Sequence, residues 1–183
     1  MPAIISMLRA VNVGGHNKIS MEALRALYES LALHDPQTYV QSGNVVFPSD
    51  AKNLKALAEK IEKAIEKKFG FRPTVILRTK SEMKAAMEKN PFAGRPEVAP
   101  NKLLVTFLAQ KPAAEALVLA QKIKADPEEM HILGREVYIY FPNGMGRPKL
   151  SWPQVERALK TTGTGRNWNT VTKLLEMAQK LEG

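Results

Sequence analysis

Two segments in the second half of the chain place glycine directly beside arginine. They are the GTGRNWN segment, residues 163–169, and the PNGMGRPK loop, residues 142–149. Glycine lets a backbone approach an anion closely, and the planar guanidinium group of arginine matches a phosphate or a carboxylate. Because a helix with well-phased apolar residues follows GTGRNWN, we predict a solvent-reachable anion site with three ligand-binding residues, Arg166, Asn167 and Asn169. A structural interpretation stays open, in which Arg166 forms a salt bridge and Asn167 only caps the helix.

A second group of polar residues lies near the start of the chain, in the segment RAVNVGGHNK. Its glycine pair allows a turn with positive φ between a strand and a helix, and the helix N-terminus could hold an anion. Arg9 falls inside the strand pattern, where a charge either pairs with a carboxylate or faces an open groove. We therefore name five candidate ligand-binding residues here, Arg9, Asn12, Gly14, Gly15 and Lys18. Turn chemistry alone would also explain the glycines.

A third polar group interrupts an apolar, β-rich stretch, TYVQSGNVVFPS, residues 38–49. Ser42, Gly43 and Asn44 form a turn signal, so we predict two short strands with a tight connection; a single bulged strand is the alternative. Gln41, Ser42 and Asn44 are further ligand-binding candidates, although turn chemistry explains the last two without a ligand.

No catalytic or metal-binding set can be assigned. The chain lacks cysteine, a dinucleotide fingerprint, a P-loop, a nucleophile elbow and an H-E-x-x-H motif. Its three histidines, residues 16, 34 and 131, are too far apart in sequence for a local metal motif. His16 is a general base by residue type only, because its loop contains no carboxylate to orient it. We therefore assign no catalytic residue and expect neither a metal nor a cofactor.

The periodicity of apolar residues predicts the elements that hold these groups. In the first half we expect a strand at 3–13, a helix at 21–31 capped by Ser20, strands within 38–49, a helix at 51–69, a strand at 74–77 and a helix at 81–89. In the second half we expect a linker at 90–101, a strand at 102–109, a helix at 112–124, a hairpin at 129–141, and helices at 152–159 and 168–181 around a glycine-rich break.

The first half therefore has the order β-α-β-β-α-β, and the second half repeats it without a fourth strand. This order suits an α+β fold of two ferredoxin-like units with added helices. We place the N-terminal unit at residues 1–92 and the C-terminal unit, with the terminal helix, at residues 93–183. A single continuous α+β domain is the alternative.

Three segments resemble one bacterial family. They are LRAVNVGGHNK at residues 8–18, TYVQSGNVVF at residues 38–47 and TGTGRNWNTVTKL at residues 162–174. Their order and spacing are similar to those of the family called domain of unknown function 1697. Ala10, Val11 and Gly165 depart from its usual pattern without removing a polar group from it. The resemblance implies a two-part α+β fold and brings no known activity, substrate or cofactor.

Composition limits the class of partner. The 183 residues include 27 Lys and Arg against 18 Asp and Glu, a formal net charge of +9 that is divided almost equally between the two halves. Such an excess favours an anionic partner, although it can also serve solubility alone. No stretch approaches the roughly 20 apolar residues of a membrane span, and the N-terminus reads as a strand rather than a signal peptide. We therefore expect a cytoplasmic protein without membrane contact.

The preferred functional hypothesis is a binding module for an anionic ligand, either nucleic acid or a phosphorylated small molecule. Tyr39, Tyr138 or Tyr140 could then stack on bases. The first alternative is an enzyme that acts on a small anionic substrate in a cleft between the two halves, with Arg9 and Arg166 among its polar groups. The second is a structural or oligomeric protein without catalysis. The oligomeric state stays open.

Overall fold

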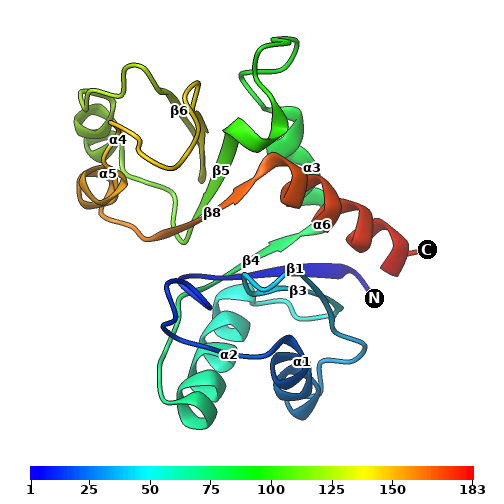
Figure 1. Cartoon of the computed structure of the whole chain (residues 1–183). Coiled ribbons are helices and arrows are strands. Elements are labelled where there is room, and N and C mark those ends of the chain that lie inside the picture. The colour runs from blue at the N-terminus through cyan, green and yellow to red at the C-terminus, as the bar shows by residue number, and fades with distance from the viewer. The chain divides into compact units, whose positions relative to one another are not determined.

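Two four-stranded antiparallel sheets organise the chain in the computed structural model, which describes residues 1–183 (Figure 1). The strand order is β2-β3-β1-β4 in one sheet and β6-β7-β5-β8 in the other. The chain forms two compact units, Met1–Ala85 with Thr172–Gly183, and Ala86–Val171. This confirms the predicted α+β class with two ferredoxin-like units. The expected division into an N-terminal unit of residues 1–92 and a C-terminal unit of residues 93–183 stays a prediction.

The first unit contains a β-α-β-β-α-β set: β1 (Ala3–Leu8), α1 (Met21–Ser30), β2 (Gln37–Tyr39), β3 (Asn44–Pro48), α2 (Leu54–Phe69) and β4 (Val75–Thr79). Ser20 begins α1 because its hydroxyl accepts a hydrogen bond from the N–H of Ala23, and Asn53 caps α2 in the same way. The helices α1 and α2 lie side by side over one face of the sheet (Figure 1). The expected pair of short strands around residue 42 is confirmed.

The second unit contains η1 (Pro100–Lys102), β5 (Leu103–Leu108), α4 (Ala114–Gln121), β6 (Glu129–Leu133), β7 (Glu136–Tyr140), α5 (Trp152–Leu159) and β8 (Gly163–Asn167). The chain passes from one unit to the other within α3 (Lys80–Glu88) and again within α6 (Trp168–Leu181). Apolar side chains of α4, α5, β5 and β7 form the core on one face of this sheet.

The expected glycine-rich break before the last helix is wrong, because residues 163–167 form strand β8 and pair antiparallel with β5. Glycine is required there by close packing against the neighbouring strand. A Cβ atom at Gly163 would lie 2.8 Å from Cγ2 of Thr106 and 3.1 Å from the carbonyl oxygen of Phe107. The second unit therefore has the complete β-α-β-β-α-β order.

The expected linker at residues 90–101 is also wrong, because this segment packs onto the second unit. Phe92 is 2% exposed, and the hydroxyl of Tyr140 donates to the carbonyl oxygen of Glu97. Arg95 donates through Nη1 and Nη2 to the two carboxylate oxygens of Glu129, each at 2.9 Å. These hydrogen bonds lower the pKa of Glu129 below its usual value. The segment is thus part of the folded unit.

Equivalent strands pair in the same register in the two sheets. In the first sheet Ser6 of β1 lies opposite Leu77 of β4, and in the second sheet Thr106 of β5 lies opposite Gly165 of β8. Leu8 and Leu108 are then the last residues of β1 and β5, at equivalent positions. Ser6 and Thr106 are therefore counterparts, and any residue of one sheet can be matched to the other by counting from them.

Candidate functional site

The structure brings the predicted site residues of the first half to one end of the first sheet. Asn12 makes the link, since its Nδ2 donates to the carbonyl oxygens of Gln41 at 2.7 Å and Ile19 at 2.9 Å. Its Oδ1 accepts from the N–H of Ile19 at 2.9 Å. The amide of Asn12 is thus occupied by the backbone, and it joins the loop after β1 to the turn between β2 and β3.

Arg9 lies directly after β1 rather than inside a strand, because β1 ends at Leu8 instead of continuing to residue 13. The N–H of Arg9 donates to the carbonyl oxygen of Thr74 at 2.9 Å, and the residue is half-buried. Gln41, across the Asn12 link, is exposed. Both candidate residues therefore lie at the end of the sheet and outside its core.

The glycine pair shapes the tip of this loop. Gly14 and Gly15 have φ values of +58° and +78°, and the N–H of His16 donates to the carbonyl oxygen of Val13 at 3.0 Å. Positive φ at both central residues is the type I′ turn of a two-residue hairpin. The loop is therefore a short hairpin, and its glycines serve the turn. Lys18 lies beyond the tip and is exposed.

The turn between β2 and β3 is held from within by Asn44. This residue is fully buried, and its Nδ2 donates to the carbonyl oxygen of Tyr39 at 3.0 Å and to Oγ of Ser42 at 2.9 Å. Gly43 has a φ of +81°, and a Cβ there would lie 2.9 Å from Cβ of Leu8. Asn44 and Ser42 therefore have a structural role in the turn.

Arg166 lies within strand β8, and only 7% of it is exposed. Its Nη1 donates to Oγ1 of Thr164 at 2.7 Å and to the carbonyl oxygen of Gly165 at 2.9 Å. Burial lowers its pKa to about 10, so the side chain stays charged at neutral pH. Asn167 caps α6 by accepting from the N–H of Thr170 at 2.9 Å, and Asn169 is exposed on that helix. The segment thus differs from the glycine-rich break that we expected.

Two of the three candidate stacking tyrosines are inaccessible. Tyr138 is fully buried and donates to the carbonyl oxygen of Ala86, and burial raises its pKa. Tyr140 lies beneath Arg95, whose guanidinium carbon is 5.7 Å from the centre of the tyrosine ring. The expectation that these two rings present a surface for base stacking is wrong. Tyr39 is partly exposed.

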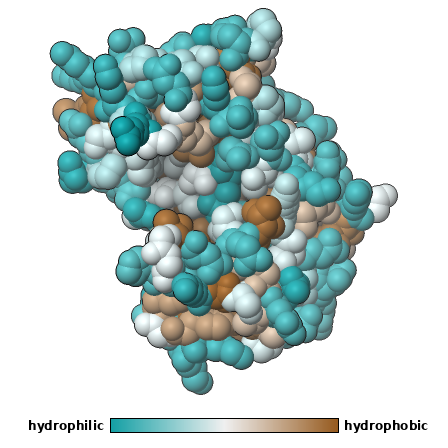
Figure 2. Space-filling model, in the orientation of Figure 1, coloured by the Kyte–Doolittle hydropathy of each residue, from teal (hydrophilic) through white to brown (hydrophobic).

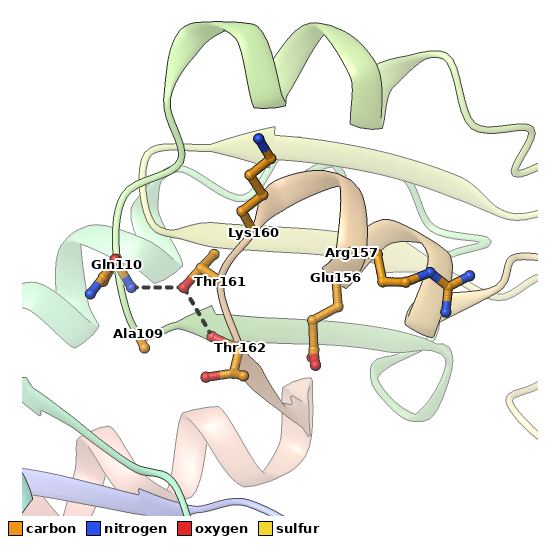
Figure 3. Close-up of a pocket in the computed structure, with 7 residues that line it drawn as sticks. All are labelled: Ala109, Gln110, Glu156, Arg157, Lys160, Thr161 and Thr162. Carbon is orange, nitrogen blue, oxygen red and sulfur yellow. Dashed lines mark hydrogen bonds between the residues drawn. The ribbon is translucent and has the colours of Figure 1, made fainter.

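A polar hollow of about 420 Å³ opens in the second unit where α5 ends and β8 begins (Figure 3). It is lined by Ala109, Gln110, Glu156, Arg157, Lys160, Thr161 and Thr162. In Figure 3, Arg157 and Lys160 extend from the end of α5, whereas Thr161 and Thr162 lie beside Ala109 and Gln110. The hollow therefore combines two cationic side chains with hydroxyl and amide groups.

The end of α5 sets the geometry of this hollow. Lys160 has a φ of 56° and its N–H donates to the carbonyl oxygen of Glu156, which ends the helix. Oγ1 of Thr161 then accepts from the N–H of Gln110 at 3.2 Å and donates to the carbonyl oxygen of Thr162 at 3.4 Å. These bonds tie the segment before β8 to the segment after β5. They leave the Thr162 hydroxyl and the Gln110 side-chain amide without a hydrogen bond in the protein.

The charged side chains around the hollow differ in whether they have a partner within the protein. Glu156 accepts a hydrogen bond from Nε1 of Trp152 at 2.9 Å. Arg157 and Lys160 form no ion pair.

The sequence motifs did not reveal this hollow, because its walls come from residues about 50 positions apart. The run Lys160-Thr161-Thr162, directly before GTGRNWN, was the only local signal.

Three general features of the structure bear on what the protein could bind. No helix is both long enough and apolar enough to span a membrane. No three side chains of His, Asp or Glu gather in a group that could hold a metal ion. In the face shown in Figure 2, hydrophilic residues cover most of the surface and hydrophobic ones form small separate areas.

Comparison with known proteins identifies the family. Residues 1–138 match the model of the family described as "Protein of unknown function (DUF1697)". A conserved bacterial protein from Streptococcus pneumoniae, SP0830, has a similar structure, with a TM-score of 0.72 and 19% sequence identity over 97% of this chain and 98% of that chain. At that identity the likeness concerns the fold. No curated protein matches the chain significantly. The chain belongs to the DUF1697 family of proteins of unknown function.

Proposed function

We propose that the protein binds a small anionic ligand, one that carries a phosphate or carboxylate group, in the hollow at the end of α5. The observation that carries this proposal is the pair of cations there. Arg157 and Lys160 have no carboxylate partner, and they line the same hollow as the Thr162 hydroxyl and the Gln110 side-chain amide, neither of which has a hydrogen-bond partner in the protein. Charge-assisted hydrogen bonds from such groups are the usual means of holding an oxyanion.

The lining favours an anion over a neutral ligand. Arg157 and Lys160 bring two positive charges to the lining, against the one negative charge of Glu156. The Glu156 carboxylate already accepts a hydrogen bond from Trp152. Arginine offers a planar fork and lysine a mobile point charge, and the two suit an oxyanion together. The volume of about 420 Å³ lies within the range of small-molecule sites.

A competing explanation is that the two cations only balance the partial negative charge at the C-terminus of α5. The chain offers a matched control for this explanation. Lys122 is the C-cap residue of α4, as Lys160 is of α5, and it is exposed and forms no ion pair. Removing either charge should change helix stability similarly, whereas only Lys160 should matter for a ligand in the hollow.

The test is calorimetric titration of the protein with orthophosphate and with citrate at low ionic strength. Arg157→Gln and Lys160→Gln should each weaken binding about tenfold, because a hydrogen bond to a charged group contributes about 1.5–3 kcal/mol. Lys122→Gln should bind as the parent does. Equal losses in all three variants would assign the effect to net charge alone and contradict the proposal.

Nucleic acid is a second candidate ligand, and the hairpin and turn of the first unit support it. Segments 9–19 and 40–44 carry Arg9, His16 and Lys18 and contain no acidic residue, and Asn12 holds them together. Binding of single-stranded RNA or DNA there should fall with salt, with a slope of log K of about −0.7 per phosphate contacted. Lys18→Gln should weaken binding and reduce that slope. Absence of binding at low ionic strength would remove this candidate.

The absence of cysteine supports a reducing compartment, so we place this binding function in the cytoplasm. Fractionation of cells that carry the tagged full chain tests that placement.

A further inference from the structure

The counterparts Ser6 and Thr106 differ in what their hydroxyl groups contact. Each lies at the middle of the central strand of its sheet, on the face that carries the helix pair of that unit. Oγ of Ser6 shares a hydrogen bond of 2.6 Å with the hydroxyl of Tyr28 on α1. The hydroxyl of Thr106 forms no hydrogen bond with the protein, although Thr106 is only 2% exposed.

In the first unit, an aromatic ring fills the space in front of Ser6. Tyr28 is fully buried, and its ring meets that of Phe47 edge-on, with the ring centres 5.5 Å apart. Phe47 of β3 lies opposite Ile4 of β1. The phenol group of Tyr28 therefore contacts Ser6 and Phe47, and Ile4 lies beside Phe47 in the same core cluster.

In the second unit, the equivalent positions line a pocket. Counting along the shared register, Leu104 corresponds to Ile4, Thr106 to Ser6, and Ile139 to Phe47. All three residues of the second unit line one pocket of about 130 Å³, which Phe141, Trp152 and Gly165 also line. The pocket therefore lies over the positions of the second sheet that correspond to Ile4, Ser6 and Phe47, the last two of which contact Tyr28 in the first unit.

The pocket wall is apolar apart from Thr106. No charged side chain lines it. The Thr106 hydroxyl is not sealed among protein atoms, because the only fully enclosed side-chain polar atom that lacks a hydrogen bond is elsewhere, at Nε of Arg78. An unsatisfied hydroxyl in an apolar site is unfavourable, and a ligand that supplies a hydrogen bond would relieve that cost.

We propose that this pocket binds a small uncharged aromatic molecule with one hydroxyl group, a phenol, in the manner of the Tyr28 side chain. An apolar cavity of about 150 Å³ is known to accept benzene, so the size is appropriate for one ring. The hydroxyl of the ligand would bond to Thr106 and its ring would lie over Leu104 and Ile139. This site is distinct from the anion-binding hollow and does not depend on it, since the two share no lining residue.

The experiment compares phenol with benzene, which differs by the hydroxyl alone. Titrations of the full chain would be followed by the methyl NMR signals of Leu104 and Ile139. We expect saturable shifts with both probes and about fivefold tighter binding of phenol, which is the effect of one hydrogen bond of about 1 kcal/mol. Thr106→Val keeps the shape and removes the hydroxyl, so it should abolish the preference and leave benzene affinity unchanged.

Ser6→Ala is the matched control at the counterpart position. It should lower the melting temperature, because the Tyr28 hydroxyl loses its partner, and it should leave the phenol preference intact. Thr106→Val should be at least as stable as the parent, since its lost hydroxyl has no partner. Three outcomes would overturn the proposal: no saturable shift at Leu104 and Ile139 with either probe, equal affinities in the parent, or a preference that persists in Thr106→Val.

Discussion

Arg78 of β4 and Arg166 of β8 occupy the same register position in the two sheets, one opposite Ile5 and the other opposite Val105. Both are buried, at 2% and 7% exposed. Since side chains alternate along a strand, each arginine points away from the helix pair of its own unit. The two units therefore share sheet order, register and a buried arginine, which extends the architectural repeat seen in the sequence to individual positions.

Arg166 can be tested by substitution with alanine. Because its guanidinium bonds to Thr164 and Gly165 within the fold, we expect a structural loss of about 2–4 kcal/mol in the free energy of unfolding. Urea denaturation measures it, and Arg147→Ala, at an exposed loop arginine, should change little. Unchanged stability of Arg166→Ala together with lost phosphate binding would instead place Arg166 at a ligand site, as the sequence pattern predicted.

Asn12 should be a stability residue of the first unit. Asn12→Ala removes hydrogen bonds to Ile19 and Gln41 at once, so we expect a loss of about 1–3 kcal/mol in the free energy of unfolding. Asn143→Ala is the control, since that exposed loop residue forms no side-chain hydrogen bond. Equal stability of the two variants would show that the link between hairpin and turn does not stabilise the fold.

Gly163 should tolerate no side chain. Gly163→Ala places a methyl group 2.8 Å from Cγ2 of Thr106 and near the Phe107 carbonyl, so overpacking should cost about 1–3 kcal/mol. Gly146→Ala is the matched control, because nothing lies within 4 Å of its Cβ position. Thermal unfolding of both variants tests the placement of β8, and a Gly163→Ala protein as stable as the control would contradict it.

The Arg95–Glu129 pair predicts a pH dependence. The pKa of Glu129 is lowered in the fold, so its contribution to stability is present above the unfolded value near 4.5 and is lost as the pH falls through the lowered pKa. Glu129→Gln should therefore lower the melting temperature by about 1–3 °C at pH 7 and converge with the parent in strong acid. A difference that is independent of pH would rule out this ionic contribution. Glu88→Gln is the exposed control.

Local patterns predicted the helices and most strands, whereas long-range packing decided the rest. Ser20 and the apolar spacing after it indicate α1 without reference to the fold. Strand β8 escaped prediction because its two glycines read as a break, and only contact with Thr106 and Leu104 explains them. Burial of Arg166 depends on that same strand pairing, which no local signal reveals.

The candidate sites likewise depend partly on local sequence patterns and partly on long-range packing. The glycine and asparagine motifs near the start correctly indicated turns, but the partners of Asn12 are 7 and 29 positions away and follow only from the fold. The hollow at the end of α5 joins Gln110 to Thr161, 51 positions apart, so no window along the sequence contains it. The pocket lined by Leu104, Thr106 and Ile139 likewise depends on the pairing of β5 with β7 and β8, which no local sequence pattern reveals.

A phosphate titration of the full chain, followed by backbone amide NMR, decides whether the hollow at the end of α5 is an anion site. We predict saturable shifts that are largest at Gln110, Thr161 and Thr162, and that are lost in a double variant with Arg157→Gln and Lys160→Gln. Shifts spread over exposed lysines without saturation, or shifts that persist in the double variant, would contradict an anion site in this hollow.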